Sequence, residues 1–153
     1  MAATRRPSLA SSLALGALSG LAGTAAMTAF QKLVEMPITG REDSYAPADF
    51  AEKVFSVSPK DEQGRNRLNY LAHFGIGTGW GVAYAFASRS GLSWPRAVAA
   101  AFAGVYTGDV ALNTALGLYK PWEWSLEETA VDVVDKLVQA GAAGAAFEVL
   151  SSG

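Results

Sequence analysis

The chain has 153 residues, of which 50% are hydrophobic and 17% are charged, and this charged fraction is below the roughly 25% of ordinary soluble domains. It contains no cysteine and a single histidine, His73, which excludes disulfides, thiolate metal sites and thiol redox chemistry. The formal net charge is -2 and no basic run is present, so no nucleic-acid partner is expected. The length fits a single domain, 1–153.

The first apolar segment, residues 9–30, contains no charged residue. A helix needs roughly 20 residues to cross about 30 Å of hydrocarbon, so a membrane span is predicted over residues 9–35, and Pro37 is expected to stop the helix. The alternative is a removed export signal, because residues 4–9 resemble a twin-arginine motif. We favour a retained span, because Ser8 stands where such signals carry a bulky apolar residue.

A polar connection, residues 37–65, follows the first span. Within it, residues 47–57 predict a short helix with one apolar side, which would lie at the membrane interface or, alternatively, in a solvated loop. The second predicted span covers residues 66–88 and holds His73. The third covers residues 95–119, whose only acidic residue is Asp109.

The last predicted span covers residues 126–150. The preceding residues 119–124 place aromatic rings around a lysine, a proline and a glutamate, as membrane interfaces favour. Ser125 followed by Glu128 predicts a capping box at the start of the helix. We therefore expect an all-α fold, a four-helix transmembrane bundle. A soluble alanine-rich bundle is the alternative, although a soluble surface helix needs a polar face and residues 9–30 have none.

A weak internal repeat accompanies these spans. Residues 23–28 align with residues 108–113, and residues 69–84 align with residues 132–147. The alignment would make the bundle two parallel helical-hairpin repeats, an arrangement that some transporters use.

Polar residues of all four spans are expected at one depth, near the side that holds residues 37–65, which we call the loop side. The first helix brings a polar face made by Thr24, Thr28, Gln31 and Glu35 toward this side. On the last helix, the polar residues fall within a stripe about 100° wide. The polar cluster expected at this depth consists of Asn69, His73, Asp109, Asn113, Glu128, Asp132, Asp135, Lys136 and Gln139.

Insertion energetics require these groups to meet. An Asp or Lys at a span centre costs roughly 2.5–3.5 kcal/mol, whereas a Leu or Val returns only about 0.3–0.6 kcal/mol. Asp132 and Lys136 can pair along the last helix because they are four residues apart. Asp109 and Asp135 then lack a cationic partner, and His73 is the nearest candidate. We expect a polar chamber that opens toward the loop side.

Glycines at four-residue spacing predict close helix packing, since small residues let helix backbones touch in lipid. A phosphate-binding loop is the alternative, but no strand precedes the glycine run of the second span and no Gly-Lys-Ser/Thr follows it. The expected packing glycines are Gly16, Gly20, Gly75, Gly77, Gly79 and Gly81.

Several short motifs resemble the YagU-like family of small bacterial inner-membrane proteins. They are the glycine-rich first span ending in Lys32, Glu35, Met36 and Pro37, the second span with His73 and Tyr84, and the third ending at Leu118 before Pro121, Trp122 and acidic residues. The resemblance implies a multi-pass inner-membrane protein and no particular activity. The connecting loop and the Asp132, Asp135 and Lys136 group depart from the family pattern.

Three functions are considered. The first is conduction or carriage of protons, cations or a small polar solute, because ionisable residues inside a membrane are candidate functional sites. The second is a non-catalytic structural or accessory membrane protein that forms homo-oligomers through its glycine faces. The third is a membrane-embedded metal-dependent enzyme, in which His73 and three aspartates, Asp109, Asp132 and Asp135, would bind a hard metal ion.

The third function has the least support, because the chain has neither a second Asp-x-x-Asp motif nor a Glu-x-x-His motif. We therefore predict that the protein is not an enzyme, holds no metal or cofactor, and lies in a lipid bilayer as a multi-pass protein of the bacterial inner membrane. Lys and Arg counts favour a cytoplasmic loop side, whereas the arginines before the first span favour a cytoplasmic N-terminus.

Overall fold

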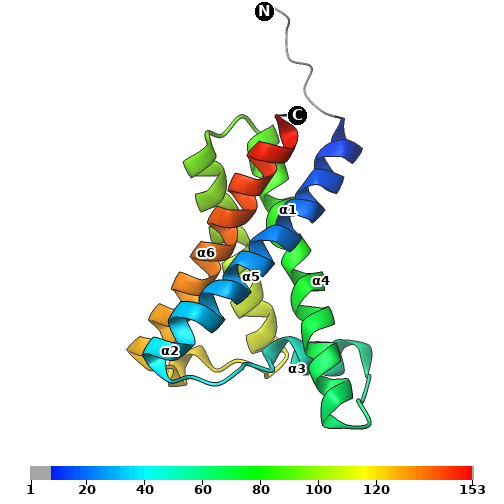
Figure 1. Cartoon of the computed structure of the whole chain (residues 1–153), viewed down its shortest axis with the longest axis vertical. Helices are drawn as coiled ribbons and strands as arrows, with labels where there is room; N and C mark the ends of the chain where they lie inside the picture. Colours follow the sequence, from blue (N-terminus) through cyan, green and yellow to red (C-terminus); the bar gives the residue numbers. More distant parts are fainter. Residues whose placement is uncertain (1–7, 153) are drawn as a thin grey trace, which may run out of the picture.

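The computed structural model describes residues 8–152, and over this range the chain is helical and contains no strand. The all-α prediction is therefore confirmed. The arginine pair of the export-signal alternative lies outside the described residues. Four long helices pack into a bundle, with α2 and α3 at one end and the start of α1 and the end of α6 at the other (Figure 1); the four are α1 (Leu9–Phe30), α4 (Glu62–Arg89), α5 (Trp94–Ala115) and α6 (Leu126–Ser151).

The prediction that Pro37 stops the first helix is wrong. The chain continues from α1 through a π-helix, Gln31–Glu35, into α2 (Met36–Thr39), and ends at Gly40, which has a φ of 70°. Proline normally ends a helix because its ring clashes with the carbonyl four residues earlier. The wider π-helical turn lies directly before Pro37 and relieves this clash.

The other predicted boundaries shift by a few residues. α4 begins at Glu62 rather than residue 66, because the Asp61 side chain accepts a hydrogen bond from Gly64 N at 2.7 Å and caps the helix. α5 ends at Ala115 rather than residue 119, because Gly117 has a φ of 74° and the chain turns back there. The short 3-10 helix Pro121–Glu123 follows.

The predicted capping box at the start of α6 is confirmed. Glu128 N donates to Ser125 Oγ at 3.1 Å, and Ser125 N donates to Glu128 Oε2 at 2.7 Å. The box satisfies two of the backbone donors that a helix leaves free at its first turn.

Glycines let α1 approach α4 and α6 closely. A Cβ added at Gly81 would lie 2.0 Å from Gly16 O, and one added at Gly20 would lie 2.7 Å from Gly77 O. The expectation that Gly75 and Gly79 pack in the same way is wrong, because both face outward and an added Cβ would meet no atom within 4 Å. Glycine occupies every second position from Gly75 to Gly81, so these residues lie on two opposite faces of α4. Only the face with Gly77 and Gly81 packs against α1.

On α1, small polar side chains face the inside of the bundle and large apolar side chains face the outside. Ser12, Ser19 and Thr24 are fully buried, while Leu18 and Leu21 of the same helix are exposed. A compact apolar core is present near the end that holds residues 90–93, which we call the terminal side. It consists of Tyr84, Ala85, Ala97, Ala101 and Phe147.

The middle of the bundle carries no exposed charge. Over residues 12–31 of α1 and its π-helix, 68–89 of α4, 97–115 of α5 and 129–147 of α6, every exposed residue is uncharged. Each stretch is about 20 residues, or about 30 Å of helix. By overall hydropathy and length, one helix of the described residues, Leu9–Thr39, is long and apolar enough to cross a membrane.

Candidate functional site

A cavity of about 540 Å³ lies between the loop-side halves of the four long helices. Eight of the nine residues of the predicted polar cluster line it, and they come from three different helices. α1 adds Thr28 and the π-helix adds Gln31 to the wall, and residues 41–47 cover the loop side. The lining members of the cluster are Asn69, His73, Asp109, Asn113, Asp132, Asp135, Lys136 and Gln139.

The ninth predicted residue, Glu128, does not belong to the cavity. It is exposed, and its carboxylate is engaged in the capping box with Ser125. Its assignment to the cluster was therefore wrong. Glu128 lies on the same face of α6 as Asp132, but about one turn closer to the start of the helix.

Lys136 is the centre of a charged group between α5 and α6. Its ammonium pairs with Asp132 on the same helix and lies 3.5 Å from Asp109 Oδ2. Asn113 Nδ2 donates to Asp109 Oδ1 at 2.9 Å, and the Tyr106 ring centroid lies 5.4 Å from the ammonium. Asp109 therefore has the cationic partner that sequence reasoning could not assign.

Two further polar contacts join α1 to its neighbours. His73 Nε2 lies 3.1 Å from Thr28 Oγ1, so the expectation that His73 serves as the partner of Asp109 or Asp135 is wrong. Gln139 Nε2 donates to Thr24 Oγ1 at 2.8 Å, and both side chains are buried. These bonds satisfy polar groups that would otherwise be costly to bury.

Asp135 differs from the other acids of the cavity. Its side chain is 6% exposed, and Gln31 Nε2 donates to its Oδ2 at 2.7 Å. Its Oδ1 has no hydrogen-bond partner among residues 8–152, and the same is true of Asp109 Oδ2 and Asp132 Oδ2. Asp109 and Asp132 both pair with Lys136, however, whereas no basic side chain of the described residues forms an ion pair with Asp135. Buried polar atoms are seldom left in this state.

Gln31 is a cavity residue that was not assigned to the site from the sequence. It begins the π-helix Gln31–Glu35, and π-helical turns often occur at functional sites. Glu35, at the other end of that turn, also lines the cavity. The polar face on the first helix was the signal that could have identified both residues.

The segment over the cavity is fixed to α4. Asn69 Nδ2 donates to Ser44 O at 3.0 Å, and Asn69 Oδ1 accepts from Ala48 N at 3.1 Å. The short helix expected at residues 47–57 is α3, Ala46–Phe55, and it buries Ala48 and Ala51. α3 therefore packs onto α4 as part of the cover of the cavity.

Arg65 strengthens this attachment. Its guanidinium pairs with Asp49 and Glu52 of α3 and lies 4.9 Å from the Tyr45 ring centroid. The hydrogen bond with Asp49, and then that with Glu52, raises the pKa of Arg65.

Acidic residues outnumber basic residues around the cavity, six to three. The three basic residues are all paired, since Lys32 pairs with Asp43, Arg41 Nη1 lies 3.9 Å from Glu35 Oε1, and Lys136 pairs with two aspartates. The excess charge is negative. The site is therefore suited to a positively charged guest.

Part of the lining is apolar, and two of its members reach the outside of the bundle. Ile76 of α4 is 41% exposed and Leu112 of α5 is 49% exposed, although both line the cavity. The cavity wall at these two residues is thus apolar, in contrast to the charged loop side. The apolar lining includes Met27, Phe50, Ile76, Trp80, Val105 and Leu112.

The cavity ends where the helices close against one another. At Gly23, an added Cβ would lie 2.7 Å from Gln139 O, and at Gly144 it would lie 2.8 Å from the Tyr84 ring. The lining of the cavity stops short of Gly23 and Gly144, and its residues nearest the terminal side are Met27, Trp80, Val105 and Gln139. The cavity is a one-sided chamber in this conformation.

Over the described range, no three His, Asp or Glu side chains are grouped so that they could hold a metal ion. The chain matches no protein-family model, no curated protein and no solved structure. What the cavity offers chemically is a buried carboxylate, a paired charge group and an apolar wall.

Proposed function

We propose that this chain is a four-span membrane protein that takes a cationic solute into the cavity from the loop side and carries it across the bilayer. The observation that carries the proposal is the acid-rich cavity of about 540 Å³ inside a bundle whose middle exposes no charge. Ionisable groups placed inside a membrane are candidate transport sites.

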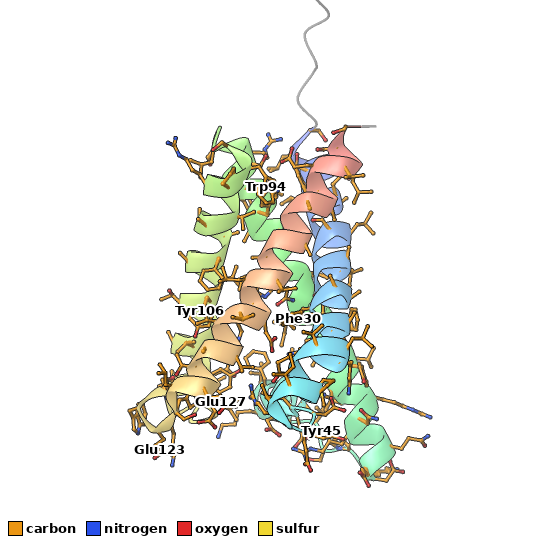
Figure 2. The ribbon with its side chains drawn as sticks, turned by 60° about the vertical axis from the view of Figure 1, so that its left-hand side comes forward. Phe30, Tyr45, Trp94, Tyr106, Glu123 and Glu127 are labelled. Atoms are coloured by element: carbon orange, nitrogen blue, oxygen red, sulfur yellow. The ribbon has the colours of Figure 1, made fainter. Side chains whose placement is uncertain are left out.

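The distribution of side chains supports the membrane setting. A soluble helix bundle exposes charged residues along its whole length, whereas here the charges of the central stretches turn inward. Trp94 is 45% exposed and Trp122 is 73% exposed. The two residues lie at opposite ends of the bundle: Figure 2 shows Trp94 near the terminal side and Glu123, the neighbour of Trp122 in the sequence, at the loop side. Membrane proteins concentrate tryptophan at both interfaces. The resemblance to the YagU-like family agrees with this proposal.

A carrier is favoured over an open channel. The cavity is closed toward the terminal side, and its volume of about 540 Å³ falls in the range of roughly 300–1,000 Å³ that small-molecule sites occupy. A solute bound there would leave by opening of the Gly-packed half, as alternating access requires.

The test is flux through the purified chain in liposomes, with guanidinium, K⁺ and H⁺ as probes and a potential-sensitive dye as the readout. We expect flux of at least one probe, and a loss of at least tenfold in Asp135→Asn and in Asp109→Asn. Glu127→Gln is the matched control, because it removes an exposed acid from the same helix as Asp135, outside the cavity. Absence of flux, or flux that both cavity variants leave unchanged, would contradict the carrier.

A second candidate is a non-catalytic structural membrane protein. The contacts that favour it are Thr24 to Gln139, Thr28 to His73 and Asp109 to Lys136, each of which joins two helices. In that case His73→Ala and Asp135→Asn would reduce accumulation of the protein in membranes. For a carrier, the same variants would accumulate normally and lose flux.

A further inference from the structure

Asp135 is the buried acid of the cavity that forms no ion pair within the described residues. This carboxylate has one donor, Gln31, on Oδ2, and Oδ1 is buried without a partner in the described chain. Asp109 and Asp132 share Lys136, and Glu35 and Asp43 have Arg41 and Lys32. Glu42, the remaining acid of the lining, is exposed, whereas Asp135 is buried. A guest that reaches Asp135 would therefore gain both a hydrogen bond and a countercharge at an atom that lacks both.

The surroundings of Asp135 add a second requirement. Trp80, Ile76 and Leu112 give the cavity an apolar wall, and Ile76 and Leu112 are also exposed on the outside of the bundle. An inorganic ion would leave this wall in contact with water. The cavity volume of about 540 Å³ is also many times the roughly 30 Å³ that one water molecule occupies, so the cavity has room for a larger guest than a single ion. The wall fits the hydrocarbon part of an organic molecule.

We infer that the cavity binds an amphiphilic primary amine, whose ammonium donates a hydrogen bond to Asp135 Oδ1 and whose apolar part lies along Trp80 toward Ile76 and Leu112. This inference names the substrate class of the proposed carrier and so rests on that function. The N–H group is essential, because a quaternary ammonium has charge but no donor. The charge is essential too, because hydrogen bonds between ionised partners are roughly twice as strong as neutral ones.

The experiment is calorimetric binding to the full chain in lipid nanodiscs, with three probes of one shape: phenethylammonium, its N,N,N-trimethyl derivative and 2-phenylethanol. We expect phenethylammonium to bind at least tenfold more tightly than either of the other two. Equal affinity for the alcohol would show that charge is not recognised, and equal affinity for the trimethyl derivative would show that the N–H group is not. Either result overturns the inference, and neither requires a variant.

Variants then locate the site. Asp135→Asn should weaken phenethylammonium binding at least tenfold, while Glu127→Gln should leave it unchanged. Unaltered binding to a folded Asp135→Asn, as judged by its helical circular dichroism, overturns the inference. If Asp135→Asn does not fold, a protection experiment with Thr28→Cys, on the cavity wall, decides. Phenethylammonium bound in the cavity should slow the reaction of this cysteine with thiol reagents. Lack of protection overturns the inference.

Binding and flux separate the two proposals. Selective binding of phenethylammonium without flux of phenethylammonium, guanidinium, K⁺ or H⁺ in the liposome assay would retain the amine site and reject the carrier. Flux of K⁺ or H⁺ that depends on Asp135, without selective amine binding, would retain the carrier and reject the amine.

Discussion

At the scale of single residues, polar contacts in this bundle have paired functions: they bury a hydrogen-bonding group and they join helices. Thr24 Oγ1 shows both, since it donates to Gly20 O at 2.8 Å within α1 and accepts from Gln139 Nε2 across to α6. Removal of one partner leaves the other buried and unsatisfied, which costs more than the bond itself contributes.

Thr24→Val and Gln139→Leu test this contact. Each single change should lower the free energy of unfolding by about 1–3 kcal/mol. The double variant should cost less than the sum of the two, with a coupling of about 0.6–1.7 kcal/mol, as measured for interhelical hydrogen bonds in membranes. The measurement is a double-mutant cycle by denaturant titration in mixed micelles. Strict additivity would show that the two side chains do not interact.

At the scale of helices, one face of α4 determines how closely α1 can approach. Gly81 lies against Gly16 and Gly20, and an added Cβ would come within 2.4 Å of Gly20 N. Gly79 lies two residues earlier on the opposite face, where an added Cβ meets open space. The same substitution at the two positions should therefore have opposite effects.

Gly81→Ala should lower the free energy of unfolding by about 1–3 kcal/mol or more, because overpacking forces the two backbones apart. Gly79→Ala should leave it unchanged or raise it by up to about 1 kcal/mol, the difference in helix propensity between the two residues. Denaturant titration followed by helical circular dichroism provides the comparison. Equal effects of the two changes would contradict the α1–α4 packing.

The helices and their approximate ends could be predicted from the sequence, because long apolar runs and the Ser125–Glu128 pair are local signals. The depth of the polar residues also follows from their positions along each helix. Pairings such as Gln31 with Asp135 could not be predicted, since they depend on how each helix is rotated about its axis. Alternating glycines in α4 offer two similar faces, so nothing local distinguishes Gly79 from Gly81.

At the scale of the whole molecule, the bundle combines an outer surface that exposes no charge over its central stretches with an acid-rich interior at the loop side. Figure 1 shows α3 and the chain around it at the same end as this interior. The cover is anchored by Asn69 and Arg65 of α4, so an opening of the loop side would have to break these contacts. In the proposed carrier, this cover would control access from the loop side, and the glycine packing would control access from the terminal side.

The most direct test of this account compares two single-cysteine variants, which is straightforward because the chain has no cysteine of its own. Thr28 lines the cavity and is partly buried, whereas Ala25, almost one turn away on α1, is exposed on the outside. In sealed membrane vesicles, a small cationic, membrane-impermeant methanethiosulfonate should modify Thr28→Cys from one side only and should not modify Ala25→Cys until detergent dissolves the lipid. Modification of Ala25→Cys as fast as Thr28→Cys would contradict a bundle that lies in the bilayer with a cavity open to water.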